Sequence, residues 1–351
     1  MEKRGEAKII GIMLILALCL FGLAMIFAFF MNFTKDYSEQ VNARANLIIY
    51  NKSVNPGVSG ENNNGISGEN NKFHAIMLYR WGNSGVPADY IQEVVSETNA
   101  NVIVLAGDIS GGLQESIENM PPGMKYILQP SPLTISSDKD LILSGEDLDT
   151  KYNILESIIT DDCIGVIIVH EKGIRNPNPD LEAYFNKFID FLQEKNIEPV
   201  LLLDSPGYEE INSEIMQTDI PDKASIWAEV RPSIWTCSDN RCGWAWGETE
   251  GSVTNHVKSR ISQLTRSPQG KLDAVLIQFG WLDNFYSLSE AGRDWKWPEP
   301  TEQQVSWTID EINNENWNNK VVIWHGGYEQ DWKSVMDDSN FASRIKNWWT
   351  G

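Results

Sequence analysis

The sequence has few of the residues that metal and nucleophile chemistry most often use. Its 351 residues include four histidines and four cysteines. His170 and Glu171 begin the zinc-protease pattern H-E-x-x-H, but Ile174 stands where the second histidine should be. The chain also has no G-x-S-x-G nucleophile elbow, no Walker loop and no glycine fingerprint for a dinucleotide. We therefore predict neither a metal nor a cofactor, and we disfavour serine hydrolase and nucleotide-binding functions.

Basic residues are also in short supply. The chain has 28 Lys and Arg against 49 Asp and Glu, which gives a formal net charge of −21 at pH 7. Such a field repels nucleic acid and anionic lipid headgroups. We therefore predict no nucleic-acid partner, and we attribute the charge to solubility outside the cell.

Charge is absent altogether from residues 9–31, which are rich in Leu, Ile, Met and Phe. At about 1.5 Å per residue a helix of this length spans the roughly 30 Å hydrocarbon core of a bilayer. Lys3, Arg4 and Lys8 precede the run, so the positive-inside rule leaves residues 1–8 in the cytoplasm and the C-terminal domain extracellular. The alternatives are a cleaved signal peptide, for which no small-residue site is evident, and prepilin-type cleavage after Gly5. We predict a single-pass anchor in the cell membrane, with the lipid bilayer as a partner.

Apolar residues thin out between the anchor and the first apolar run that follows. Residues 32–72 contain the tandem repeat VSGENNNG and ISGENNKF, rich in Gly, Asn and Ser. Such a composition cannot bury enough apolar surface to offset the loss of chain entropy. We predict a flexible polar linker here and a folded domain over residues 73–351.

From residue 73 onward, short apolar runs alternate with helical patterns. The eight runs cover residues 74–81, 101–107, 125–130, 164–170, 199–204, 225–230, 274–280 and 320–326. Near-continuous aliphatic runs are typical of parallel strands that are buried on both faces. Helix starts between them include Pro87, Pro179 after Asn178, and a capping box formed by Thr301 and Gln304. The pattern predicts an α/β fold, a (β/α)₈ TIM-type barrel preceded by one transmembrane helix, with a doubly wound open sheet as the alternative.

Polar residues stand at or near the ends of these runs, where a (β/α)₈ barrel has its active site. The polar residues and the two tryptophans at these ends are Arg80, Trp81, Asp108, Gln129, His170, Glu171, Asp204, Glu229, Arg231, Asp283, Trp324 and His325. Polar residues are common at strand ends for structural reasons alone, but here the ends converge on one mouth. Paired carboxyl groups at such a mouth suit the cleavage of glycosidic bonds. One of them donates a proton to the leaving oxygen, and the other attacks the anomeric carbon or activates water.

This arrangement resembles, distantly, the barrel-type glycoside hydrolases, many of which carry the acid/base glutamate at the end of the fourth strand. The resemblance implies that Glu171 is the acid. Apolar walls and a nearby carboxylate, from Asp204, Glu229 or Asp283, should raise its pKa by disfavouring the charged form. As its partner we rank Asp283 first, because it is expected across the barrel, and Glu229 second. One large clan has an asparagine before this glutamate and a second glutamate on strand seven, where this chain has His170 and Asp283. Family 18 chitinase-like enzymes have alternating aspartates before it, where this chain has Ile and Val. The resemblance covers the barrel layout and one glutamate, and it also fits a relative that has lost activity.

Tryptophan is concentrated in the C-terminal part of the chain. Of 14 tryptophans, 13 follow residue 226. Two predicted long loops after strands six and seven, on the expected active face, hold Trp235, Trp244, Trp246, Trp295 and Trp297. Indole rings suit the stacking of sugar rings, although they can equally pack such loops against a barrel. The predicted substrate-binding set comprises these five with Arg80, Trp81, Asp108, His170, Asp204, Arg231, Trp324 and His325.

Two of the four cysteines lie close together in the polar stretch CSDNRC. Outside the cell, the spacing of Cys237 and Cys242 suits a local disulfide. A metal site is less well supported, because no second cysteine pair or nearby histidine completes four ligands.

The features together predict a membrane-anchored extracellular glycoside hydrolase that acts on polysaccharide or glycan through two carboxyl groups. One alternative is a non-catalytic carbohydrate-binding or cell-envelope structural barrel. Another is a metal-dependent hydrolase that uses His170, His325 and nearby carboxylates.

Overall fold

The part of the chain that carries the fold lies between residues 72 and 350. A computed structural model describes residues 72–80, 84–136, 145–171, 179–203, 218–230, 232–238, 241–265, 272–279, 281–288, 293–297, 299–317, 320–327, 332–333 and 339–350. The chain separates into two compact units, Met1–Glu61 and Asn62–Gly351, and all the described residues belong to the second. The predicted segments 1–8 and 9–31, and the linker except for its last residue, lie outside the described residues. None of the described helices is long and apolar enough to cross a membrane.

The main sheet closes into a parallel barrel. It has nine strands, and eight of them, all but the two-residue β4 (Ile135–Ser136), form the barrel wall. The eight are β1 (Phe73–Tyr79), β2 (Val102–Asp108), β3 (Lys125–Ser131), β5 (Cys163–Glu171), β6 (Glu198–Leu203), β7 (Ser225–Val230), β10 (Ala274–Gln278) and β13 (Lys320–Gly327). All eight predicted strands are confirmed. The parallel pairing of β3 with β5 closes the circle, which excludes the open doubly wound sheet.

Two apolar layers hold the barrel, one on each side of its wall. The inner layer includes one residue from each strand, namely Met77, Val104, Ile127, Ile167, Leu202, Trp227, Leu276 and Val322. The outer layer lies between strands and helices and contains the alternate residues, such as Leu78, Leu203 and Ala228. Both faces of the strands are therefore buried, which is why the runs read as continuously apolar.

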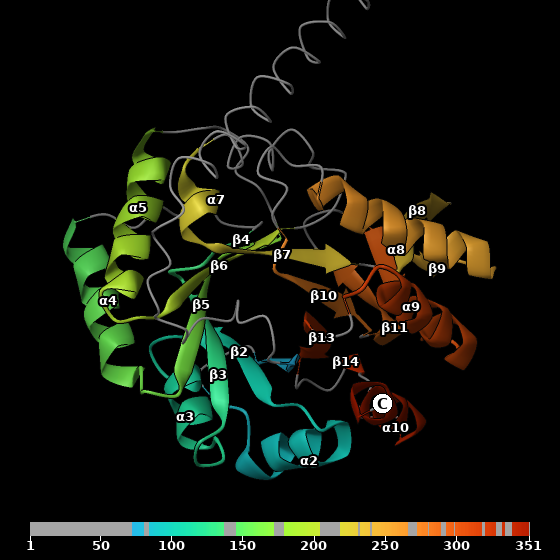
Figure 1. Ribbon diagram of the computed structural model, residues 1–351, viewed down its shortest axis with the longest axis horizontal. Helices are drawn as coiled ribbons and strands as arrows, with labels where there is room; N and C mark the ends of the chain where they lie inside the picture. Colours follow the sequence, from blue (N-terminus) through green and yellow to red (C-terminus); the bar gives the residue numbers. More distant parts are fainter. Residues whose placement is uncertain are drawn as a thin grey trace, which may run out of the picture. The chain divides into compact units, whose positions relative to one another are not determined.

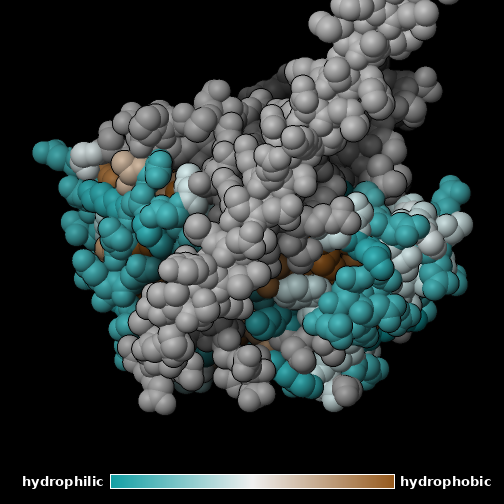
Figure 2. Space-filling model, turned by 45° about the horizontal axis from the view of Figure 1, so that its top comes forward, coloured by the Kyte–Doolittle hydropathy of each residue, from teal (hydrophilic) through white to brown (hydrophobic). Residues whose placement is uncertain are grey.

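Helices surround the strands (Figure 1). They are α2 (Ala88–Thr98), α3 (Gly112–Glu118), α4 (Gly145–Ile158), α5 (Pro179–Gln193), the short α7 (Ile220–Lys223), α8 (Glu250–Thr265), α9 (Glu302–Asn314) and α10 (Ser339–Thr350). The predicted capping box is confirmed, because Thr301 Oγ1 accepts from Gln304 N and Gln304 Oε1 accepts from Thr301 N. The described surface seen in Figure 2 is mostly hydrophilic, as expected for helices that bury one face only.

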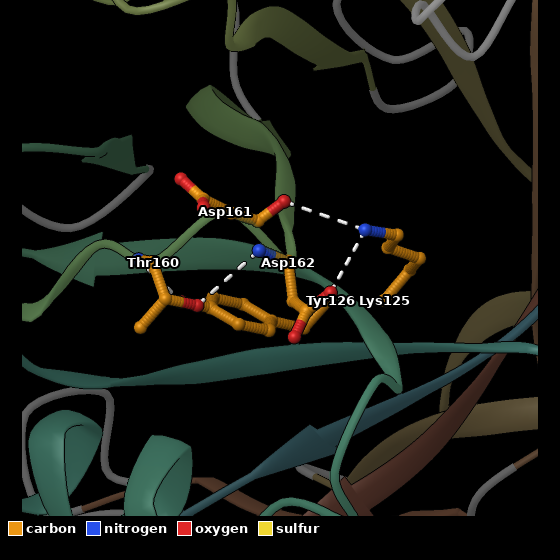
Figure 3. Close-up of polar contacts among 5 residues, drawn as sticks. All are labelled: Lys125, Tyr126, Thr160, Asp161 and Asp162. Carbon is orange, nitrogen blue, oxygen red and sulfur yellow. Dashed lines mark hydrogen bonds and ion pairs between the residues drawn. The ribbon is translucent and has the colours of Figure 1, made fainter.

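A polar cluster lies at the amino ends of β3 and β5, where the barrel closes (Figure 3). Lys125 Nζ lies 2.8 Å from Asp162 Oδ1, and Tyr126 N donates to Asp162 O at 3.0 Å. The Tyr126 hydroxyl accepts from Thr160 N and lies 3.0 Å from Thr160 Oγ1. Burial raises the pKa of the Tyr126 hydroxyl, so the group is held as a neutral hydrogen-bonding partner. This cluster ties the closing strands together at the end of the barrel opposite the predicted active site.

A second sheet was not predicted from the sequence. It contains β8 (Ser233–Ser238), β9 (Arg241–Trp246), β11 (Trp281–Leu288), β12 (Arg293–Trp297) and β14 (Trp332–Lys333), in the order β14-β11-β12-β9-β8. These strands come from the segments that follow β7, β10 and β13, so they extend from the carboxyl end of the barrel. The interpretation of the tryptophan-rich segments as long loops was therefore wrong. Their aromatic residues are common in strands, but their pairing joins three separate parts of the chain.

Candidate active site at the carboxyl end of the barrel

Four polar side chains lie inside the barrel near the carboxyl ends of its strands. Gln129, His170, Glu229 and Gln278 are 7%, 8%, 0% and 2% exposed. Glu229 lies two positions after the inner-layer residue Trp227 on β7. Gln278 lies two positions after the inner-layer residue Leu276 on β10. Alternate residues share a face, so both side chains belong to the inner face of their strands. This inner polar layer covers the apolar inner layer on the side where (β/α)₈ enzymes bind their substrates.

An irregularity in β5 brings His170 into this layer. Ile167 belongs to the inner layer, whereas both Ile168 and Val169 belong to the outer one. The pairing of β5 with β6 shifts between Ile167 and Val169, so that His170 comes into register with Leu202, an inner-layer residue. Thr134 Oγ1 donates to the carbonyl of Ile167 at 2.7 Å and satisfies a backbone group at the irregularity.

His170 is held by an amide on the neighbouring strand β3. Gln129 Nε2 lies 2.9 Å from His170 Nδ1, and both side chains are buried. Because the amide nitrogen can only donate, this arrangement makes Nδ1 the acceptor and leaves the ring proton of a neutral imidazole on Nε2. His170 is therefore fixed in both tautomer and orientation.

Glu229 is held in the same way by an amide on the adjacent strand β10. Gln278 Nε2 donates to Glu229 Oε1 in a close contact. A hydrogen bond donated to a carboxylate stabilises its ionised form, and removal from water acts in the opposite direction. Gln278 was not among the predicted residues. The alternation of Ala274, Leu276 and Gln278 on one strand face was the available signal.

Glu171, the predicted acid, is in a different register from the inner polar layer. It is the last residue of β5 and pairs with Leu203, which in turn pairs with Ala228, and both of these belong to the outer layer. Strict alternation from Ile167 would have put Glu171 in register with inner residues, and the β5 irregularity moves His170 there instead. The side chain of Glu171 lies outside the described residues. Within the described barrel interior, the carboxylate at the mouth belongs to Glu229.

Asp283 was predicted at the end of the seventh barrel strand, but that strand ends at Gln278. The structure places Asp283 within β11, in the second sheet. Trp81, Asp204 and Arg231 lie outside the described residues, as do the side chains of Asp283, Trp324 and His325.

Arg80 and Asp108, at the ends of β1 and β2, bond to nearby backbone. The Arg80 guanidinium donates to the carbonyl of Gly85. Asp108 Oδ1 accepts from Ser110 N at 2.6 Å. Both contacts shape the turns that follow their strands, and the predicted role of these two residues in substrate binding stays a prediction.

Trp246 is not an exposed platform for sugar rings. It is 7% exposed and belongs to the outer apolar layer, where its ring stacks at 6.4 Å between centroids on Phe279. The side chains of the other four predicted tryptophans lie outside the described residues. Backbone register pairs Trp235 with Trp244, Trp295 with Cys242, and Trp297 with Leu282. Paired and alternate residues share a face, so Trp235, Trp244, Trp246, Trp295 and Trp297 all belong to one face of the second sheet.

The predicted disulfide concerns two residues that pair directly in the β8–β9 hairpin. Cys237 is opposite Cys242 by backbone register, and their side chains lie outside the described residues. Directly opposite residues have Cβ atoms about 4.5–5.5 Å apart, close to what a disulfide needs. We expect mass spectrometry of protein taken from the cell surface to find these two cysteines joined.

Cys163 provides the internal control for that experiment. It is a buried free cysteine, and burial raises the pKa of its thiol to about 12, so it should react with alkylating reagents only after unfolding. Alkylation of Cys237 and Cys242 in the folded, unreduced protein would contradict the disulfide.

Metal ligands do not gather in the described part of the chain. Among its residues, no group of three or more His, Cys, Asp or Glu side chains is placed to hold a metal ion. His325, which the metal-dependent alternative requires, has its side chain outside this part.

Comparisons with known proteins give a likeness of fold. The chain matches no protein-family model and no curated protein. It is similar to a solved endoglucanase from Pseudomonas stutzeri, with a TM-score of 0.46 and 12% identity over 78% of this chain and 94% of that one. For a chitinase from Chromobacterium violaceum the TM-score is 0.47 and the identity 10%, over 78% of this chain and 99% of that one. For an endocellulase from Pyrococcus horikoshii, solved with cellotetraose, the TM-score is 0.45 and the identity 9%, over 78% of this chain and 92% of that one. The solved structures to which the chain is distantly similar thus include glycoside hydrolases, these three at TM-scores below 0.5. The barrel is established by its own strand order, and the chemistry of the site has to come from its own side chains.

Proposed function

We propose that this protein is a glycoside hydrolase that cleaves polysaccharide or glycan with two carboxyl groups. The observation that carries the proposal is Glu229, a fully buried carboxyl group inside the barrel at its carboxyl end, held by Gln278. An isolated carboxylate is costly to bury, so a fold that keeps one at the mouth and supplies it with a donor has a use for it.

The hydrogen bond from Gln278 suits Glu229 to the role that needs an ionised group. An ionised carboxylate serves as nucleophile, or as the base that activates water, on one side of the scissile bond. The proton donor is then a second carboxyl group, for which Glu171 and Asp283 are the candidates. Glu171 ends β5, which is separated from β7 by β6 alone, so the two backbones lie about 10 Å apart at a strand spacing of about 4.8 Å. Because Glu171 is in register with outer-layer residues, its side chain would have to turn inward at the end of β5 for the two carboxyl groups to reach the separations of about 5–9.5 Å that glycosidases use.

The direct test is a hydrolysis screen of the full-length protein. Plant, fungal and bacterial cell-wall polysaccharides would be incubated with the protein and the release of new reducing ends measured. We expect release from one polysaccharide class, and its loss when Glu229 is replaced. Tight saccharide binding without any hydrolysis would favour the non-catalytic carbohydrate-binding barrel. An inert protein that neither binds nor cleaves a saccharide would overturn both.

The proposal includes anchoring in the cell membrane with the barrel outside. Its support is the uncharged run over residues 9–31 and the basic residues Lys3, Arg4 and Lys8 before it. Protease added to intact cells should release the barrel by cutting the preceding polar linker, and immunoblotting of the medium would detect it. A cytosolic protein should stay intact in the same cells. Cleavage only after permeabilisation would reverse the orientation.

A further inference from the structure

Two amide side chains of the inner polar layer face each other across the barrel. In the circular strand order, β3 and β10 are four strands apart in both directions, so Gln129 and Gln278 come from opposite walls. Each amide nitrogen is committed to a protein partner, Gln129 Nε2 to His170 Nδ1 and Gln278 Nε2 to Glu229 Oε1. Both amides therefore present their carbonyl oxygens as the remaining polar atoms.

These carbonyl oxygens are buried acceptors. Neither Gln129 Oε1 nor Gln278 Oε1 has a hydrogen-bond partner among the described residues, and the two side chains are only 7% and 2% exposed. A buried acceptor left without a donor costs about 1–3 kcal/mol, and native structures seldom keep one without a reason. Two of them on facing walls of the same layer indicate that a ligand supplies the donors.

We propose that Gln129 and Gln278 form a subsite that accepts hydrogen bonds from the hydroxyl groups of an uncharged sugar. The carboxylate of Glu229 lies beside Gln278, so an acidic sugar would bring a second negative charge next to it, and the described inner polar layer contains no Lys or Arg to pair with that charge. The inference rests on the proposed function and narrows its substrate to neutral saccharides rather than those built from uronic acids.

The test measures binding, so that it does not depend on turnover. Full-length protein would be titrated calorimetrically with sulfur-linked tetrasaccharides, which resist hydrolysis. Each tetrasaccharide of glucose, galactose or mannose would be paired with the tetrasaccharide of the corresponding uronic acid. We expect a neutral member to bind at least about tenfold more tightly than its acidic counterpart. Gln129→Met and Gln278→Met keep the side-chain volume but remove the carbonyl, and each should weaken that binding by about 3- to 10-fold, the net value of one uncharged hydrogen bond.

Gln114 supplies the matched control. Its amide also donates to a glutamate, Glu118 Oε1 at 3.0 Å, but on the exposed surface of α3, so Gln114→Met should leave binding unchanged. Where a methionine variant fails to fold, Gln129→Asn or Gln278→Asn withdraws the carbonyl by one methylene and carries the same expectation.

The inference is overturned if no neutral tetrasaccharide binds, if the acidic member binds equally well, or if the folded variants bind like the wild type. Binding of neutral sugars without hydrolysis of their oxygen-linked counterparts leaves the subsite standing and removes the hydrolase. Hydrolysis by the wild type, together with unchanged binding in both variants, removes the subsite and leaves the hydrolase standing.

Discussion

Replacing Glu229 with glutamine is expected to slow polysaccharide hydrolysis by about 10²–10⁴-fold, the share that a positioned acid or base commonly contributes. The substitution keeps the shape of a side chain that is fully buried. It removes the carboxylate, which either attacks the anomeric carbon or activates the water that does so. Saccharide binding should change little, because the two amide carbonyls remain. Release of reducing ends under saturating substrate measures the effect as a fall in kcat.

Glu311 offers a matched control for that substitution. It is also buried, at 8% exposed, but it lies on α9 outside the barrel wall. Glu311→Gln should leave turnover of the folded enzyme unchanged. Glu229→Ala in the presence of azide should recover activity, since a small anion can occupy the place of the lost carboxylate. Full activity of Glu229→Gln would remove this residue from the mechanism.

The same assay distinguishes the two candidates for the proton donor. Loss of the acid slows the cleavage of an unactivated glycoside but spares a nitrophenyl glycoside, whose leaving group needs no proton. Glu171→Gln and Asp283→Asn should therefore differ, and the variant that shows this selective loss identifies the acid. If neither shows it, both residues are excluded as the donor.

Trp227→Ala is expected to lower the free energy of unfolding by about 3–5 kcal/mol, the usual cost of emptying a large buried aromatic site. Trp227 is fully buried in the inner layer, with its ring 5.4 Å from that of Phe73 between centroids. It also lies two positions before Glu229 on the same strand face, so its loss removes the floor of the inner polar layer. Denaturant unfolding followed by circular dichroism measures the change.

Trp227→Phe tests whether the loss of stability comes from the lost packing of the ring. It keeps an aromatic ring against Phe73 and should cost clearly less than the alanine substitution, with much of the activity retained. A loss below about 1 kcal/mol for Trp227→Ala would contradict the packed inner layer, because a collapsed or solvated interior would tolerate the change.

The barrel was accessible from the sequence because its signals are local and repeated. Each strand is buried on both faces, so each appears as a short apolar run whatever its neighbours are. The capping box at Thr301 and Gln304 likewise depends on residues three apart. Glu229 was identified by its position at the end of a run, since the carboxyl ends of parallel strands meet at one mouth.

The second sheet and the inner polar layer depend on contacts between distant parts of the chain. Strands β8 and β9 pair with each other locally, as do β11 and β12, but these two pairs and β14 join into one sheet only because three barrel strands end close together. The pairing of β9 with β12 and of β11 with β14, and the packing of Trp246 on Phe279, have no short-range signature.

The sequence by itself determined the number and order of the barrel strands, the helices between them, and the end at which polar side chains gather. Only the tertiary structure decided which of those side chains meet. A one-residue irregularity in β5 exchanges the register positions of His170 and Glu171 relative to the inner layer. It depends on pairing with β4 and β6 and on the bond from Thr134 to Ile167. Side-chain alternation has a period of two, so one inserted residue reverses every assignment beyond it, and no local pattern in the apolar run marks where that occurs.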